Sequence, residues 1–129
     1  MDSKKVVIVQ QLPERLSVEE GRRFLLQVES ALQEDRPRVV LDCSILRQID
    51  SAGIHVLLEC LEGAMKRNGD VKLAAIPSAV FAVLKVTQVD TLFEAFDNIP
   101  EAVESFQHIS APILPEAVQP GYSSLPQRA

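Results

Sequence analysis

The chain has 129 residues, of which 47% are hydrophobic, and its formal net charge at pH 7 is −5. This length allows one domain with one modest core, and this hydrophobic content argues against disorder. The acidic balance disfavours direct binding to nucleic acid. No apolar run reaches the roughly 18 residues that a membrane-spanning helix needs, so membrane insertion is not expected. Residues 1–5 lack the apolar segment of a signal peptide, which makes a cytoplasmic location the expectation.

The first part of the chain alternates between apolar runs and a helical pattern. Residues 6–9 read Val-Val-Ile-Val, which predicts a first strand buried on both faces. Ser17 and Glu20 have the spacing of a capping box, with Ser17 as the cap and Glu20 reaching back. The helix that follows carries apolar residues at helical spacing, and residues 39–42 predict a second short buried strand.

A second helical pattern begins near Ser51. Its apolar positions, which we expect to face the sheet, are Ile54, Leu57, Leu58, Leu61 and Met65. Basic residues suit the end of this helix, and Gly69 is expected to take the left-handed conformation of a C-cap.

The remaining elements are shorter. Residues 71–76 predict a third main strand, and Pro77 suits the first turn of another helix. The apolar face of that helix is expected to consist of Val80, Phe81, Val83 and Leu84. Residues 92–96 predict a short strand and residues 99–106 a last helix. This alternation predicts an α/β fold, an open and mostly parallel or mixed sheet of four to five strands with about four helices packed on it.

The composition changes near residue 110, which predicts a domain over residues 1–109 and a proline-rich tail over residues 110–129. The tail holds four of the eight prolines of the chain. It is expected to be mobile or to lie against a neighbour, and its Ile113, Leu114 and Val118 make a docking role conceivable.

Ser51 lies where a loop turns into a helix, and two interpretations of it stay open. A serine there suits the N-cap, because its hydroxyl can accept a bond from a free amide of the first turn. The same free amides and the helix dipole also favour a phosphate. Phosphorylation would add roughly −1.5 to −2 charges to a surface expected to carry Asp42, Asp50 and Glu59 already. Gly53 lacks a side chain, so a partner could approach the first turn closely.

Two segments carry a family resemblance. Val39-Val40-Leu41-Asp42, followed by Ile49-Asp50-Ser51-Ala52-Gly53-Ile54, resembles the central signature of STAS domains, the anti-sigma factor antagonists and their relatives. In that family the serine after the aspartate is the regulatory phosphorylation site. The resemblance, which covers residues 6 to about 109, therefore implies Ser51 as phospho-acceptor, with Asp50, Ala52 and Gly53 shaping the site. The partner that it implies is an anti-sigma factor with serine kinase activity.

The sequence departs from the family pattern at one turn. Many phosphoswitch members have Gly-x-Leu-Asp before the first helix, and the matching residues here are Glu14-Arg15-Leu16-Ser17. Ser17 stands in the place of the aspartate, so the resemblance does not supply a carboxylate there, and docking of the usual kinase stays open.

The residues do not indicate an enzyme, a metal site or a cofactor. Ser51 and His55 are four apart on one helix, but no Gly-x-Ser-x-Gly elbow or glycine-rich phosphate loop is present. His55 and His108 are the only histidines, and neither has a cluster of metal ligands near it in the sequence. Cys43 and Cys60 match neither a metal pair nor a redox pair.

We therefore expect a non-enzymatic regulatory domain whose partner binding is switched by phosphorylation of Ser51. His55, Glu59 and Glu62 share one side of the helix with Lys66 and are expected to face water, and the first three are the predicted partner surface. The alternative is a constitutive STAS subunit of a membrane transporter or a scaffold complex, with Ser51 only a cap. The oligomeric state stays open.

Overall fold

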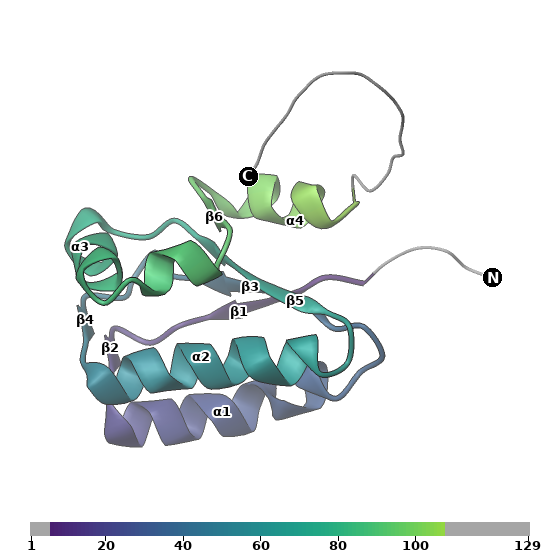
Figure 1. Cartoon of the computed structure of the whole chain (residues 1–129), viewed down its shortest axis with the longest axis horizontal. Helices are drawn as coiled ribbons and strands as arrows, with labels where there is room; N and C mark the ends of the chain where they lie inside the picture. The colour runs from purple at the N-terminus through teal and green to yellow at the C-terminus, as the bar shows by residue number, and fades with distance from the viewer. Residues whose placement is uncertain (1–5, 108–129) are drawn as a thin grey trace.

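The structure, a computed structural model, describes residues 6–107, which fold as an α/β domain (Figure 1). Strands β1 (Ile8–Gln11), β3 (Arg38–Asp42), β5 (Asp70–Ala74) and β6 (Ala95–Phe96) form a parallel sheet in the order β1-β3-β5-β6. Two short strands, β2 (Arg15–Leu16) and β4 (Gln48–Ile49), form a second parallel sheet. The helices are α1 (Val18–Leu32), α2 (Ser51–Met65), α3 (Ser78–Val86) and α4 (Ile99–Gln107), with a 3-10 turn, η1, at Val89–Leu92. The predicted fold class is confirmed.

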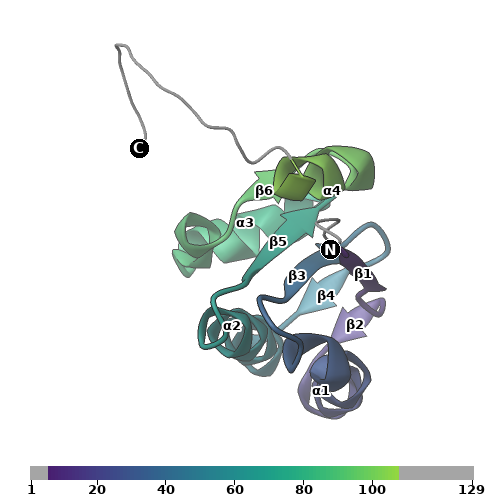
Figure 2. The same ribbon diagram turned by 90° about the vertical axis from the view of Figure 1, so that its right-hand side faces the viewer.

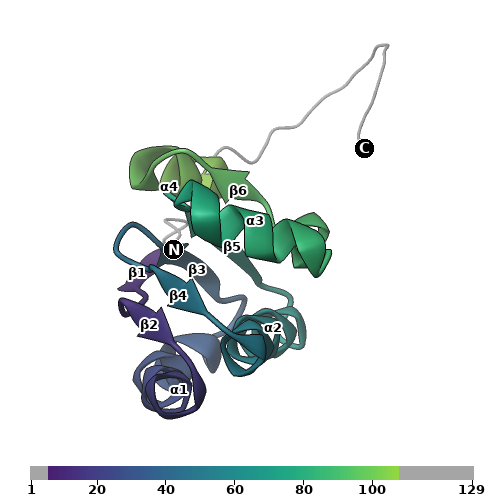
Figure 3. The ribbon, with the colours of Figure 1, turned by 90° about the vertical axis from the view of Figure 1, so that its left-hand side faces the viewer.

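The elements form three layers. Helices α1 and α2 lie side by side on one face of the main sheet, and α4 lies on the other (Figures 1 and 2). Side chains alternate along the central strands, so Val39 and Leu41 enter the large core under α1 and α2 while Val40 packs under α4. Helix α3 stands at the end of the sheet, beside β4 (Figure 3).

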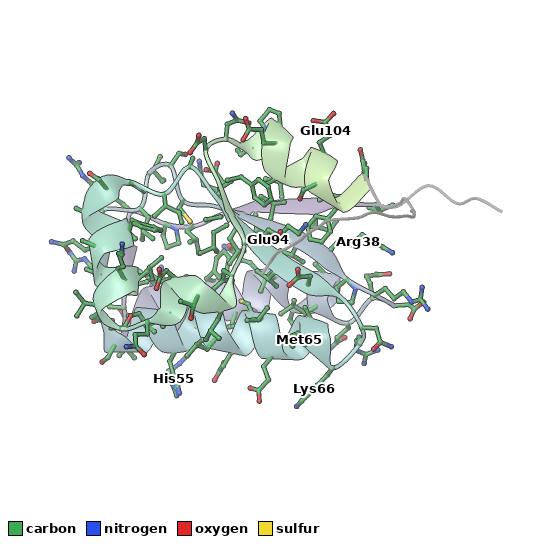
Figure 4. All side chains as sticks on the ribbon, turned by 45° about the horizontal axis from the view of Figure 1, so that its top comes forward. Arg38, His55, Met65, Lys66, Glu94 and Glu104 are labelled. Carbon is green, nitrogen blue, oxygen red and sulfur yellow. The ribbon has the colours of Figure 1, made fainter. Side chains whose placement is uncertain are left out.

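A buried lysine fixes α4 to the sheet. The Nζ of Lys72 on β5 lies 4.2 Å from the centre of the Phe106 ring, and it donates a hydrogen bond of 2.8 Å to the Ser105 hydroxyl. The same ammonium forms an ion pair of 3.0 Å with Glu94, which is labelled in Figure 4. Because this cation is paired, it is tolerated where an unpaired charge would be costly.

The first strand differs from its prediction. It spans residues 8–11 rather than 6–9, and its side chains are alternately half-buried and exposed instead of buried on both faces. The reason is its place in the sheet: among the strands of residues 6–107, β1 pairs only with β3 and forms an edge. Val9 is consequently 42% exposed.

Two helix starts also differ in detail. Ser17 precedes α1 at the N-cap position, but its hydroxyl donates to the Glu20 carboxylate at 2.6 Å and makes no hydrogen bond to the backbone of the first turn. The predicted capping box is therefore half formed: Ser17 is the N-cap and the Glu20 side chain reaches back to it, but the Ser17 hydroxyl does not bond a first-turn amide. Pro77 is the N-cap of α3 rather than a residue of its first turn. The strand predicted over residues 92–96 is shortened to β6, because residues 89–92 form η1.

The end of α2 corrects two further predictions. Met65 is 60% exposed, because the inward face of the last turn passes through Ala64, which is fully buried. Asn68, with φ 64°, takes the left-handed conformation that we expected at Gly69. Gly69 is required for another reason: a Cβ there would overlap the carbonyl oxygen of Pro37.

The predicted boundary at residue 109, His108 and the tail over residues 110–129 lie outside the described residues. Within residues 6–107, no helix is both long enough and apolar enough to cross a membrane.

Candidate functional site

Ser51 is the first residue of α2, and it is not the cap. Asp50 holds the N-cap position, where its carboxylate accepts a hydrogen bond of 3.0 Å from the Gly53 amide. Ser51 is exposed, and no residue between 6 and 107 forms a hydrogen bond with its hydroxyl. The capping interpretation of Ser51 is thus wrong, since the neighbouring aspartate does that work. The hydroxyl is left open to solvent.

The backbone of β2 passes against the first turn of α2 and fixes its position. A Cβ on Gly53 would overlap the Leu16 carbonyl oxygen and would lie 2.7 Å from Cγ1 of Ile49. The Asp50 amide also donates to that carbonyl, at 3.4 Å. Gly53 is therefore buried within the domain. Its lack of a side chain allows β2 of the same chain, rather than a separate partner, to approach the first turn. Ala52 beside it is half-buried.

The turn that departs from the family pattern lies at this end of the molecule. The Glu14 carbonyl accepts hydrogen bonds from the Arg47 and Gln48 amides at 2.7 and 3.2 Å, and the Glu14 carboxylate forms an exposed ion pair of 3.3 Å with Arg47. The Ser17 hydroxyl, bonded to Glu20, lowers the pKa of that carboxyl group. Ser17 thus interacts with its own helix. This is a local arrangement that the motif comparison could not show.

A depression of about 440 Å³ adjoins this turn. Its lining includes Arg15, Arg47 and Asp50 on one side and Ala79 and Val83 of α3 on the other. Two guanidinium groups and the N-cap carboxylate therefore share one hollow with an apolar helix. The sequence did not single out either arginine, because they are brought here by the pairing of β2 with β4.

Helix α3 presents an apolar face to solvent. Phe81 and Val83, expected to face inward, are each 36% exposed, and Val86 is 82% exposed. Of its nine residues only Val80 and Leu84 are buried. A helix this apolar all round, with Lys85 as its single charged residue, is typical of one that is covered by something. The almost wholly apolar composition of α3 was the signal in the sequence for this exposed face. The helical spacing of its apolar residues alone did not reveal it.

The predicted stripe on α2 is exposed as expected. His55, Glu59 and Glu62 lie on the outer side of the helix, and Figure 4 shows His55 and Lys66 projecting from it into solvent. Among the described residues, His55 and Ser51 form no hydrogen bond with each other, so a nucleophile–base contact is not in place.

The two cysteine thiols are not accessible to solvent. Cys43 and Cys60 are both buried and both free, and burial raises the pKa of each thiol from 9.0 to about 12. Within residues 6–107 no three His, Cys, Asp or Glu side chains are grouped so that they could hold a metal ion.

The parallel sheet, the paired helices and the Asp-Ser-x-Gly turn at the start of α2 together define a STAS domain. A family model described as "Mlab, STAS domain" matches residues 2–94. The chain belongs to the STAS domain family, and the resemblance noted in the sequence is confirmed.

Solved structures of similar fold include proteins of two kinds. A Thermotoga maritima protein assigned as a candidate anti-sigma factor antagonist is 25% identical, with a TM-score of 0.72 over 79% of this chain and 88% of its own. An anti-sigma factor antagonist domain protein of Planctomyces limnophilus is 22% identical, with a TM-score of 0.70 over 77% and 89%. A sulfate transporter family protein of Wolinella succinogenes is also 22% identical, with a TM-score of 0.68 over 83% and 93%.

Proposed function

We propose that this STAS domain is a regulatory binding module of the anti-sigma factor antagonist type, acting in the cytoplasm without catalysis of its own. In this proposal its partner is an anti-sigma factor with serine kinase activity, and phosphorylation of Ser51 changes the affinity for that partner. The observation that carries the proposal is the exposed Ser51 hydroxyl, which forms no hydrogen bond with residues 6–107 because Asp50 caps the helix instead. Modification of such a group changes the surface and leaves the fold in place.

The surroundings of Ser51 give a phosphate two opposing influences. The Asp50 carboxylate already occupies the Gly53 amide, and it repels a second anion beside it. Arg15 and Arg47 line the adjoining depression, and phosphate is a strong acceptor for guanidinium groups. A phosphate drawn toward Arg47 would compete with Glu14 for its guanidinium. The modification would therefore rearrange charge on a surface that the partner must contact.

The proposed partner surface has two parts that meet near Ser51. One is the charged stripe of His55, Glu59 and Glu62 on α2, and the other is the exposed apolar face of α3. Apolar area supplies binding free energy, whereas charges at the rim mainly set the association rate and the choice of partner. A charge change at Ser51 would therefore alter how fast and with which partner the domain associates, while the apolar contact of α3 stays in place.

The test is affinity capture with wild-type, Ser51→Ala and Ser51→Asp baits, followed by titration calorimetry with the captured partner. We expect Ser51→Asp and Glu59→Lys each to weaken binding by about tenfold or more, with little change in stability. Glu101→Lys is the matched control, because Glu101 is exposed on α4, away from α2. Unchanged affinity in the first two variants would move the interface away from Ser51.

The second candidate function is a constitutive subunit of a membrane transporter or scaffold complex. The observation in its favour is the similarity in fold to the sulfate transporter family protein of Wolinella succinogenes. At 22% identity, that similarity establishes only a shared fold. Mass spectrometry of Ser51 in protein isolated from its native cell separates the two. A phosphorylated fraction supports the switch, whereas an unmodified serine in protein that copurifies with a membrane complex supports the constitutive subunit.

A further inference from the structure

The two edges of the main sheet are protected to different degrees. β6 is only two residues long, and a very short edge strand offers little template for further pairing. β1 has four residues, Ile-Val-Gln-Gln, with no charge and no proline among them. Natural edge strands usually carry such protection or are covered by another segment. The composition of β1 therefore indicates that something covers it.

The backbone of β1 has free groups that point to the open edge. The Leu12 amide donates to the Asp42 carbonyl of β3 at 2.9 Å. Since successive backbone amides of a strand point to opposite sides, the Gln10 amide also faces β3, and those of Val9 and Gln11 face away from it. Among residues 6–107, β3 is the only strand that pairs with β1.

Both sides of this edge also offer surface to a further strand. A groove of about 510 Å³ lies between β1 and the end of α1, lined by Ile8, Gln10 and Ala31 among others. On the other face Val9 is 42% exposed, because α4 covers β3, β5 and β6 and leaves β1 largely bare. An added strand would therefore contact Ile8 and Ala31, among polar side chains, on one face and Val9 on the other.

The described chain ends near this edge. Val7, just before β1, packs against the same cluster as Phe106 in the last turn of α4. Figures 1 and 2 agree that α4 ends on the side of the molecule where β1 begins. A connection of three residues, 108–110, can reach at most roughly 10 Å from the end of α4, at about 3.3 Å per residue.

We propose that residues 110–114 of this same chain add to the open edge of β1 as a fifth, parallel strand. The sequence Ala111-Pro112-Ile113-Leu114-Pro115 fits one alignment. If the Ala111 and Ile113 amides face β1, Pro112 lies on the solvent side, where its missing N–H costs nothing, and Pro115 ends the pairing. The side chains of Ile113 and Leu114 then fall on opposite faces, one over the groove and one over Val9.

The test is residue-resolved amide hydrogen exchange on the full chain. The amides of Val9 and Gln11 are expected to exchange about tenfold or more slowly than in an unstructured peptide, because each donates to the added strand. Ile113→Pro removes the central donor of that strand and should abolish this protection. The Gln10 amide, bonded to β3, is the internal control and should stay protected in both proteins.

Gln119→Pro is the matched control variant, since it lies beyond the proposed strand and should leave Val9 and Gln11 protected. Three results would overturn the proposal. Val9 and Gln11 could exchange freely in the wild type, or their protection could persist in Ile113→Pro. Protection that rises with protein concentration would show that a second copy, rather than the tail, occupies the edge. None of these outcomes depends on Ser51 or on its partner.

Discussion

The two ends of α2 are held by the same device but expose different chemistry. At each end a glycine lets a backbone carbonyl approach closely: Leu16 at Gly53 and Pro37 at Gly69. At the C-terminal end the Pro37 carbonyl also accepts from the Asp70 amide at 2.9 Å. Only the N-terminal end adds an exposed serine, Ser51, whose hydroxyl forms no hydrogen bond with the described part of the chain. Rigid placement of the helix is thus separate from the feature that makes one end a candidate switch.

The largest expected effect tests whether the close backbone contacts at Gly53 and Gly69 fix the two ends of α2. Gly53→Ala and Gly69→Ala should each lower the free energy of unfolding by about 3 kcal/mol, because the new methyl group meets backbone that cannot rotate away. Gly63→Ala in the same helix is the control: its Cβ would lie an ordinary 3.7 Å from Cδ1 of Leu32. That variant should gain roughly 0.5–1 kcal/mol from helix propensity. Urea unfolding of the three variants measures the difference. Equal stability of all three would show that the backbone contacts at Gly53 and Gly69 do not require glycine.

The next effect concerns the interior between these ends. The unfolded chain releases a proton from each thiol above pH 9, whereas the buried Cys43 and Cys60 keep theirs until about pH 12. The stability that this difference contributes is fully present below pH 9 and is lost as the pH rises, by about 1.4 kcal/mol per thiol at pH 10.

Denaturant unfolding between pH 8 and pH 10.5 measures this loss. The double variant Cys43→Ala/Cys60→Ala serves as the control, and the comparison is of slopes against pH, since the variant also loses packing. An equally steep fall in the double variant would assign the alkaline loss to other groups.

A smaller effect on the free energy of unfolding distinguishes Asp50, which caps α2, from its neighbour Ser51. Asp50→Ala should cost about 1 kcal/mol, because the Gly53 amide loses the carboxylate that it donates to. Urea unfolding of wild type and variant at pH 7 measures this cost, and an unchanged free energy of unfolding in the variant would contradict it.

The sequence was sufficient where a pattern is local and repeated. The buried strand over residues 39–42, the helix from Ser51 and the exposure of His55, Glu59 and Glu62 follow from periodicity. The arrangement around Ser51 was not local. Asp50 and Ser51 are both good caps, and the choice between them depends on where β2 fixes the first turn.

The exposed side of α3 was missed for a similar reason. Helical spacing defines an apolar stripe but not its width, and an almost wholly apolar helix has no polar side to mark the outward direction. Phe81 and Val83 were therefore assigned to the core by a rule that applies only to amphipathic helices. The position of β1 was shifted because an edge strand carries no requirement for two buried faces.

The smallest expected effect is the one on which the switch depends most. Ser51→Ala should change the free energy of unfolding by less than about 0.5 kcal/mol, because the hydroxyl is exposed and makes no bond to the described residues. Ser105→Ala is the matched serine control. Its hydroxyl accepts from Lys72 at 2.8 Å and donates to the Ala102 carbonyl at 2.7 Å, so its removal should cost about 1 kcal/mol or more. Both are measured in the same urea titration. A loss in Ser51→Ala as large as that in Ser105→Ala would mean that Ser51 supports the fold, and a residue that supports the fold cannot be modified without also disturbing it.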